Sequence, residues 1–107
     1  MSLAPIFDTP YYAVIFASTQ TASLEGYGEM ADKMESLAQL QPGYLGIDSA
    51  RSAIGITVSY WRTLEDIKAW RANLDHTAAR NQGRTQWYQQ FTVRIAKVEH
   101  NYDFHLP

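Results

Sequence analysis

The chain has 107 residues, of which 46% are hydrophobic and 13% aromatic, and its net charge is −2. This length suits one domain with a buried core and is too short for two ordinary domains. The small negative charge gives no long-range attraction for nucleic acid or an anionic membrane, so we expect neither as a partner. The sequence has no cysteine, which excludes disulfides and thiolate chemistry.

The start of the sequence carries no visible targeting segment. Met1–Pro5 lacks the basic and apolar regions of a secretory signal. The longest strongly apolar run, Ala13–Ala17, is too short to cross a bilayer. We therefore expect a cytoplasmic protein without a membrane segment.

The first half of the sequence predicts a strand, a helix and a hairpin. Tyr11–Ser18 is an expected strand, and both of its faces are apolar. Ser23–Gln41 carries an apolar stripe with helical period and ends at a Pro-Gly pair. Tyr44–Ala50 and Ile54–Trp61 alternate in polarity and are joined by a short link, which predicts an antiparallel hairpin.

A polar segment divides the second helical region. Thr63 is a predicted N-cap, and the apolar positions that follow it, among them Trp70, recur with helical period. We expect Asn73 and Asp75 to interrupt this helix. His76 then begins another helical segment, so that an indole and an imidazole lie near each other at the edge of the sheet.

The order of the expected elements defines a fold class. Phe91–Glu99 is the last expected strand, and it completes the order β-α-β-β-α-β of a ferredoxin-like α+β domain with an antiparallel sheet. The helices of such a domain cover one face of the sheet, and the other face here is not polar enough to meet water. We therefore expect a homodimer in which two sheets cover each other.

The whole chain, residues 1–107, is expected to form this single domain, with its core at about residues 10–100. The C-terminal extension, residues 101–107, places Tyr102, Phe104 and Leu106 in alternation. Alternating apolar residues are typical of an extended segment with one apolar side. We expect this extension to contact the partner subunit.

Several motifs resemble those of the antibiotic biosynthesis monooxygenase family of dimeric α/β-barrel proteins. The matching motifs are Pro42-Gly43-Tyr44-Leu45-Gly46, Tyr60-Trp61 with Leu64-Glu65-Asp66, Trp70, His76, and Trp87-Tyr88. The resemblance implies a ferredoxin-like subunit, a barrel formed by two subunits, and a pocket between the sheet and the helices of each. Characterised members of this family include cofactor-independent oxygenases of polycyclic phenols and haem-degrading oxygenases.

The haem-degrading members have a histidine that ligates the iron, a tryptophan that bends the macrocycle, and an asparagine on the first strand. This chain resembles them at Trp70 and more loosely at His76. The position that corresponds to the asparagine holds Ile15 or Phe16. The spacing from Trp70 to His76 is also shorter than the spacing between the tryptophan and the histidine of the haem-degrading members. Both departures favour a cofactor-independent reaction over haem breakdown.

His76 is the leading catalytic candidate, because an imidazole titrates near neutral pH and can take a proton from a phenol or bind iron. The alternative is that His76 has no catalytic role and is a turn residue that pairs with Asp75. Arg94 and Ser59 are candidates for stabilising an oxyanion, and Asp48 is expected to point into the same space as Ser59. Arg51 and Arg62, like Arg94, could also bind an anionic substrate, although such arginines are usually solvated or paired.

Aromatic side chains are expected to form the pocket walls. Trp70 belongs to an apolar helix face, so it either packs in the core or contacts the ligand, and the two roles are compatible. Phe16 and Tyr60 are expected to bind substrate, and Trp87 either closes the pocket or packs its helix on the sheet. The tail carries a second set of chemistry-bearing residues, His100, Asp103 and His105, but a flexible end without supporting partners predicts no metal site.

The preferred hypothesis is a cofactor-independent monooxygenase that acts on a small aromatic or polycyclic phenolic substrate. His76, Trp70 and Arg94 would be catalytic. The substrate-binding residues would be Phe16, Tyr60, Ser59 and Trp87. Two alternatives stay open: a haem-binding or haem-degrading monooxygenase with His76 as the axial ligand, and a non-catalytic dimer that binds a small apolar ligand.

Overall fold

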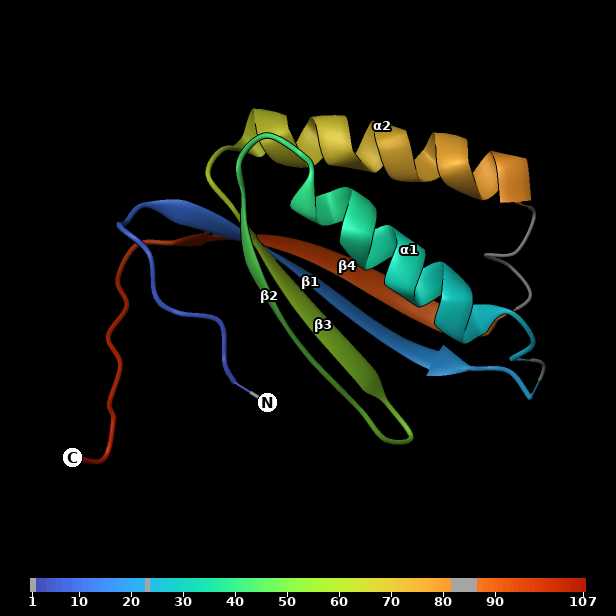
Figure 1. Ribbon diagram of the computed structural model, residues 1–107, viewed down its shortest axis with the longest axis horizontal. Helices are drawn as coiled ribbons and strands as arrows, with labels where there is room; N and C mark the ends of the chain where they lie inside the picture. Colours follow the sequence, from blue (N-terminus) through green and yellow to red (C-terminus); the bar gives the residue numbers. More distant parts are fainter. Residues whose placement is uncertain (1, 23, 82–86) are drawn as a thin grey trace.

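A computed structural model describes residues 2–22, 24–81 and 87–107, without the side chains of residues 75–81. Its elements are β1 (Tyr11–Gln20), α1 (Tyr27–Gln39), β2 (Tyr44–Arg51), β3 (Gly55–Trp61), α2 (Leu64–Asn81) and β4 (Tyr88–Val98). This order confirms the predicted ferredoxin-like β-α-β-β-α-β plan (Figure 1).

The four strands form one antiparallel sheet in the order β2-β3-β1-β4. Phe16 of β1 pairs with Thr57 of β3 on one side and with Val93 of β4 on the other. Because directly paired residues of neighbouring strands point to the same face, each row of pairs belongs to one face. The rows through Val14 and Phe16 form the helix-side face, and the row through Ile15 belongs to the opposite face, which we call the outer face.

Trp61 is the centre of the core on the helix-side face. Its side chain is fully buried and packs with Ala38 of α1 and with Ile67 and Trp70 of α2. These helix positions belong to the apolar stripes visible in the sequence, so the helical period identified the faces that pack. Both helices therefore cover the same face of the sheet, α1 against β2 and α2 against β3.

The N-terminus of α2 is capped as predicted. The backbone N–H of Asp66 donates to Oγ1 of Thr63 at 3.1 Å, and the Thr63 hydroxyl donates to Oδ2 of Asp66 at 2.8 Å. Threonine at this position satisfies an amide of the first turn that has no partner within the helix. The cap fixes where α2 leaves the end of β3.

The prediction that Asn73 and Asp75 interrupt this helix was wrong. α2 continues through both residues to Asn81, and His76 lies within it. Asparagine and aspartate cost at most about 0.7 kcal/mol relative to alanine in a helix interior. Burying the side chain of Trp70 against the core outweighs such a cost, because a large buried side chain contributes roughly 1.5–3 kcal/mol.

Two other boundaries differ from the predicted ones. α1 begins at Tyr27, later than expected, because Gly26 before it adopts a left-handed conformation with φ 79°. β4 begins at Tyr88, before the expected start at Phe91. The predicted helical segment continues into residues 82–86, which lie outside the described part of the chain.

The N-terminal arm, residues 2–10, covers one end of the outer face (Figure 1). The backbone N–H of Ala4 donates to Oδ1 of Asp48 at 2.7 Å. The ring of Phe7 packs against those of Tyr11 and Tyr60, with centroids 5.4 and 6.0 Å away. The arm therefore fills the outer face at the start of β1 with aromatic contacts.

β3 carries its aliphatic side chains on the outer face and its small polar side chains on the helix-side face. Ile56 and Val58 belong to outer rows, and the side chain of Ile56 is 48% exposed. Thr57 and Ser59 point toward the helices. Aliphatic side chains that face away from the helices leave apolar surface uncovered in a single chain.

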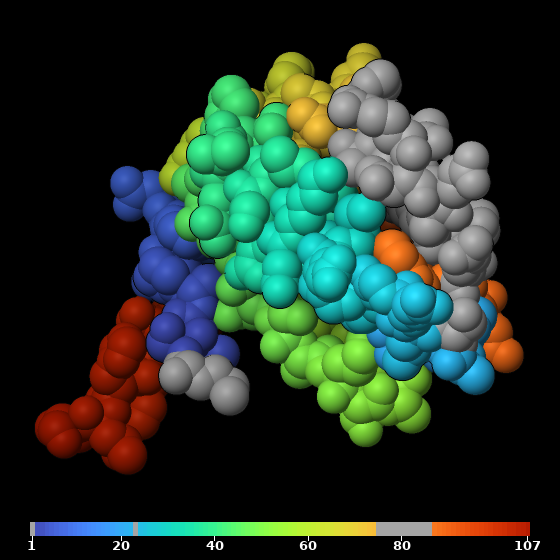
Figure 2. All heavy atoms as spheres, turned by 45° about the vertical axis from the view of Figure 1, so that its right-hand side comes forward, coloured from blue at the N-terminus to red at the C-terminus, as the bar shows by residue number. Residues whose placement is uncertain are grey.

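The C-terminal extension projects from the body of the molecule beside the N-terminal arm (Figure 2). Its apolar side chains Tyr102, Phe104 and Leu106 are 92%, 79% and 84% exposed. The expected contact of this extension with a partner subunit stays a prediction. Within the described residues, neither helix is long and apolar enough to cross a membrane, and the cytoplasmic localisation also stays a prediction.

Candidate functional site

A cavity of about 730 Å³ lies between the helix-side face of the sheet and the two helices. Its floor comes from all four strands, and its roof comes from α1 and α2. Pockets that bind small organic molecules typically enclose roughly 300–1,000 Å³, so the size suits a ligand of several rings. The resemblance implied a pocket in this place, and the cavity occupies it.

Aromatic rings form the wall of the cavity over β1 and β4. The ring of Phe16 is stacked on that of Phe91, with centroids 5.4 Å apart and planes 25° apart. Tyr88 meets Phe16 edge-on, also at 5.4 Å. Offset and edge-to-face arrangements are the favoured geometries of aromatic pairs, so a planar ligand could extend this stack.

Trp70 joins the cavity to the core. Its side chain is 9% exposed, is stacked on Trp61 with ring centroids 5.9 Å apart, and also lines the cavity. Trp70 therefore packs in the core and also lines the cavity, and its expected contact with a ligand stays a prediction. A wall residue held on two sides is a rigid support for a ligand.

Trp87 also combines packing with a place in the cavity wall. Its Nε1–H donates to the carbonyl oxygen of Glu25 at 2.9 Å, and its ring meets Tyr27 edge-on at 5.8 Å. The side chain is 9% exposed and lines the cavity. Trp87 therefore attaches the start of α1 to the start of β4 at this end of the cavity.

Hydroxyl groups line the opposite wall, over β2 and β3. Oγ of Ser49 and Oγ1 of Thr57 are 3.3 Å apart and form a hydrogen bond. Oγ of Ser59 accepts a hydrogen bond from Nε1 of Trp61 at 2.9 Å. Since a hydroxyl both accepts and donates, the hydrogen of Ser59 can still be donated to a ligand. The sequence had singled out Ser59 but not Ser49 or Thr57, although the hairpin register places all three together.

Charged residues also belong to the described part of the lining. Arg51 at the end of β2 and Arg71 on α2 line the cavity together with Glu35 of α1. One terminal nitrogen of Arg51 donates to Oγ of Ser18, which is 3% exposed. The sequence indicated Arg51 only as one of three candidate arginines, and it gave no signal for Arg71 or Glu35.

Tyr60 and Arg94 do not line this cavity. The row that contains Tyr60 and the row that contains Arg94 both belong to the outer face. The hydroxyl of Tyr60 donates to Oδ2 of Asp48 at 2.8 Å, so Asp48 also lies on the outer face, away from Ser59. The expectation that Asp48 and Ser59 share one space was wrong, because neighbouring rows of a sheet point to opposite faces.

Two tyrosines in the strands of the sheet have raised pKa values and are held in the protonated form. Burial, with help from the hydrogen bond to Asp48, raises the pKa of Tyr60 to about 12. Burial also raises the pKa of Tyr44, and the negative charge of Glu35 adds to this effect. Neither phenol is therefore a general base near neutral pH.

His76 is placed by its backbone alone. It lies in α2, six positions after Trp70 along the same helix. Its side chain is outside the described part of the structure. Its role as a base or as an iron ligand stays a prediction.

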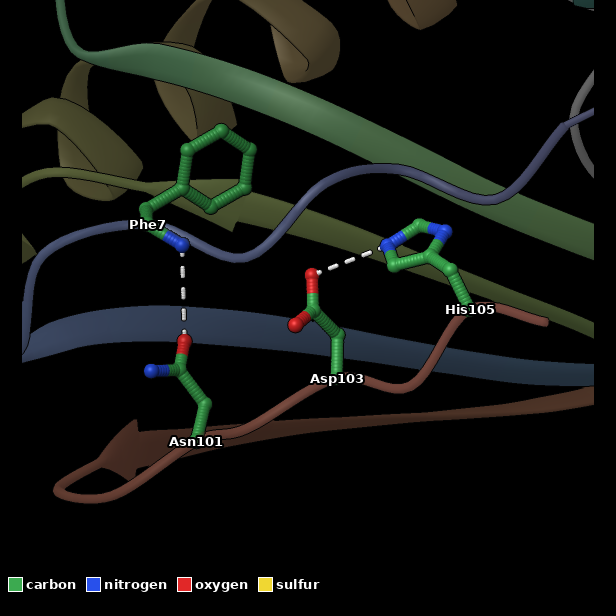
Figure 3. A network of polar contacts seen from close by, with 4 residues as sticks. All are labelled: Phe7, Asn101, Asp103 and His105. Carbon is green, nitrogen blue, oxygen red and sulfur yellow. Dashed lines mark hydrogen bonds and ion pairs between the residues drawn. The ribbon is translucent and has the colours of Figure 1, made fainter. Parts of the chain in front are cut away.

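The tail residues considered as metal ligands lie away from the cavity. The side chains of Asp103 and His105 approach to 3.2 Å, and they are 52% and 82% exposed (Figure 3). Asn101 instead faces the N-terminal arm and the start of β1. Its Oδ1 accepts hydrogen bonds from the backbone N–H of Phe7 and from the hydroxyl of Tyr11. Among the described residues, no three histidine or acidic side chains gather in a way that could hold a metal ion.

Solved structures share this fold. SnoaB from Streptomyces nogalater, a cofactor-independent oxygenase, matches with a TM-score of 0.64 and 9% identity over 89% of this chain and 97% of SnoaB. A Nitrosomonas europaea protein, provisionally named an antibiotic biosynthesis monooxygenase, has a TM-score of 0.64 and 16% identity over 91% and 97% of the two chains. A MhuD variant with two manganese protoporphyrin IX molecules per active site has a TM-score of 0.56 and 22% identity over 88% and 98%.

These likenesses confirm the predicted fold, which is that of the antibiotic biosynthesis monooxygenases. No protein-family model matches the sequence. The chain is 50% identical over 94 residues to the uncharacterized protein YqjZ of Bacillus subtilis, and the match covers 86% of this chain and 82% of YqjZ. The chain therefore belongs to the same family as YqjZ.

Proposed function

We propose that this protein oxygenates a small aromatic, phenolic substrate in the cavity without a cofactor. The observation that carries the proposal is a cavity of about 730 Å³ with stacked aromatic rings on one wall and hydroxyl groups on the other. Such a site suits a planar substrate that carries oxygen atoms on one edge. The shared fold with SnoaB, a cofactor-independent oxygenase, supports the same chemistry.

The substrate itself must supply the electrons in this reaction. Loss of a proton from a phenolic methylene compound gives an electron-rich anion that reduces dioxygen directly. In the balanced reaction, one methylene group and one dioxygen molecule give one carbonyl group and one water molecule. One oxygen atom enters the product, and the other leaves as water with the two methylene hydrogens. The protein then needs a base, donors for the developing oxyanion, and a cavity that excludes water.

We assign these tasks to residues as follows. His76 is the proposed base, because its imidazole would accept a proton near neutral pH. The Ser59 hydroxyl is the proposed oxyanion donor, since its oxygen already accepts from Trp61. Phe16, Trp70 and Trp87 would hold the aromatic body of the substrate. Tyr60 and Arg94 receive no task in the cavity.

Oxygen uptake tests the proposed base. We expect the protein to accelerate oxygen consumption by a tricyclic phenol such as dithranol, and His76→Ala to lose most of this acceleration. A base in proton transfer typically contributes about 10²–10⁴-fold. His100→Ala removes an exposed histidine outside the cavity and should leave the rate unchanged. Equal rates of the His76→Ala variant and the unmodified protein would eliminate His76 as the base.

We also propose that a second copy of the chain covers the outer face. Beyond the N-terminal arm, this face presents the aliphatic side chains Ile56 and Val58 of β3 and the half-buried Ile15 of β1. A two-fold dimer would bury two such faces against each other, which is the arrangement that the resemblance implies.

Haem is the second candidate ligand, because the MhuD variant that binds manganese protoporphyrin IX shares this fold. Arg51 and Arg71 could hold the propionates, Trp70 could contact the ring, and His76 is the proposed iron ligand. Bound haem would supply the redox chemistry of its iron. A Soret band that forms on titrating haem and is lost in His76→Ala would favour this candidate, and an unchanged haem spectrum would exclude it.

A further inference from the structure

The side chain of Arg51 crosses the sheet within a single row. Arg51 of β2 pairs with Gly55 of β3, and Gly55 pairs in turn with Ser18 of β1. The guanidinium passes over Gly55 and donates to Oγ of Ser18. Because Ser18 is 3% exposed, a buried hydroxyl fixes the position of the positive charge at the end of the cavity.

Gly55 provides the space for this crossing. A Cβ atom added there would overlap the end of the Arg51 side chain. Among the described glycines, only Gly26 and Gly43 have positive φ, so Gly55 is not needed for an unusual backbone conformation. The glycine at this position instead keeps open the path of the arginine.

The charge of Arg51 is left available to a ligand. Within the described residues its hydrogen-bond partner is a neutral hydroxyl, and a guanidinium has several further N–H donors. Among the lining residues whose side chains the structure describes, the charged ones are Arg51, Arg71 and Glu35, and together they carry a net positive charge, although the whole chain carries −2. The described part of the lining is thus positive within a protein that is negative as a whole.

The aromatic wall begins beside this charge. Ser18 pairs with Phe91, so the row of Arg51 continues directly to the stacked pair of Phe16 and Phe91. A ligand whose ring lies on these phenylalanines would therefore direct a substituent toward the guanidinium. Planar carboxylates match the fork of N–H groups on an arginine.

Resting on the proposed function, we propose that the substrate is an aromatic carboxylate, whose carboxylate binds Arg51 while its ring packs against Phe16 and Phe91. Ser18 and Gly55 are positioning residues, because they act through Arg51. Arg71 lines the same cavity and contributes to its positive charge.

A pair of probes tests the carboxylate site. We would measure binding of 2-naphthoate and of neutral 2-naphthalenemethanol by quenching of tryptophan fluorescence, since Trp70 and Trp87 line the cavity. A partly exposed, charge-assisted hydrogen bond predicts that the acid binds roughly tenfold more tightly than the alcohol. This preference should fall as the salt concentration rises.

Two variants remove the preference in different ways. Arg51→Gln deletes the charge, and Gly55→Ala keeps the charge but displaces the side chain, with no new backbone strain. Both should bind the acid no better than the alcohol and should still bind the alcohol. Lys68→Gln is the control, because it removes one positive charge from an exposed site on α2 outside the cavity lining and should keep the preference.

The outcomes separate this proposal from the proposed function. Equal binding of acid and alcohol to the unmodified protein would overturn the carboxylate site and leave the aromatic cavity intact. Binding of neither probe would contradict both proposals. Haem also carries carboxylates. A parallel titration with haem and with its dimethyl ester therefore shows whether the carboxylate that binds Arg51 belongs to haem or to a small aromatic acid. A preference for free haem alone, lost in Arg51→Gln, would overturn the small aromatic acid as the substrate.

Discussion

The indole of Trp70 is stacked on the indole of Trp61, with ring centroids 5.9 Å apart and planes 26° apart. Trp61 is fully buried at the centre of the core, whereas Trp70 also lines the cavity. The core and the cavity therefore share one wall. Changes at this wall should affect stability and ligand binding together.

Replacing Trp70 tests the shared wall. Truncation of a buried tryptophan typically costs about 3–5 kcal/mol, so Trp70→Ala should lower the free energy of unfolding by that amount. Trp70→Phe should cost less, because a ring remains on Trp61, and its smaller ring should still weaken binding of an aromatic ligand. Urea unfolding measures the first effect and ligand titration the second. A loss below about 1 kcal/mol in Trp70→Ala would contradict the shared wall.

Two glycine substitutions should change stability in opposite directions. Gly43 has φ 80°, and a Cβ added there would overlap the carboxylate of Asp66, which takes part in the cap of α2. Gly43→Ala should therefore cost about 1–2 kcal/mol or more. Gly28 lies in α1, and a Cβ added there would meet nothing within 4 Å outside its own helix backbone, so Gly28→Ala should raise the free energy of unfolding by up to about 1 kcal/mol. Thermal unfolding of both variants checks the sign of each change in stability, and equal changes in the two variants would contradict this account.

The raised pKa of Tyr60 predicts a loss of stability at high pH. An unfolded tyrosine releases its proton near its ordinary pKa of 10.0, whereas the pKa of folded Tyr60 is about 12. The stabilisation is therefore complete below pH 10 and is lost as the pH rises toward 12, because the unfolded state binds fewer protons there. Tyr60→Phe should reduce the fall in unfolding free energy between pH 10 and 11, measured with urea.

The exposed Tyr102 provides the matched control for this pH effect. Its side chain is 92% exposed, and Tyr102→Phe should leave the pH profile unchanged. An identical profile for Tyr60→Phe and the unmodified protein would contradict the raised pKa of Tyr60.

A charge on the outer face should prevent dimerisation. Ile56 on β3 and Leu64 at the start of α2 are each 48% exposed, but only Ile56 lies on the outer face. We expect the unmodified protein and Leu64→Asp to sediment at twice the mass of one chain. Ile56→Asp should sediment as a single chain, because burying an unpaired carboxylate is costly. A monomeric unmodified protein would contradict the covered outer face.

The fold could be predicted because its signals are local and periodic. The alternation of Ile54–Trp61 assigned Thr57 and Ser59 to one face and Ile56 and Val58 to the other, as the structure shows. The continuity of α2 could not be predicted in this way. Asn73 and Asp75 favour a break by their own propensities, and only the packing of the helix against the core overrides them.

The site could be predicted only in part, because it depends on which strands are neighbours. The helical stripe indicated Trp70, and the resemblance indicated the pocket. The strand order β2-β3-β1-β4 decides that Arg51 reaches Ser18 and that Arg94 belongs to the outer face. Neither outcome follows from the alternation of one strand, since alternation separates two faces without saying which one the helices cover.

The central claim is that oxygenation takes place in the cavity on the helix-side face. The most direct measurement is the rate of quinone formation from dithranol in two variants with the same substitution on opposite faces. Thr57 lines the cavity, and Thr92 belongs to the outer face. The account predicts that Thr57→Phe abolishes the acceleration and that Thr92→Phe keeps it, with one dioxygen consumed for each quinone. Full activity of a folded Thr57→Phe variant would contradict it.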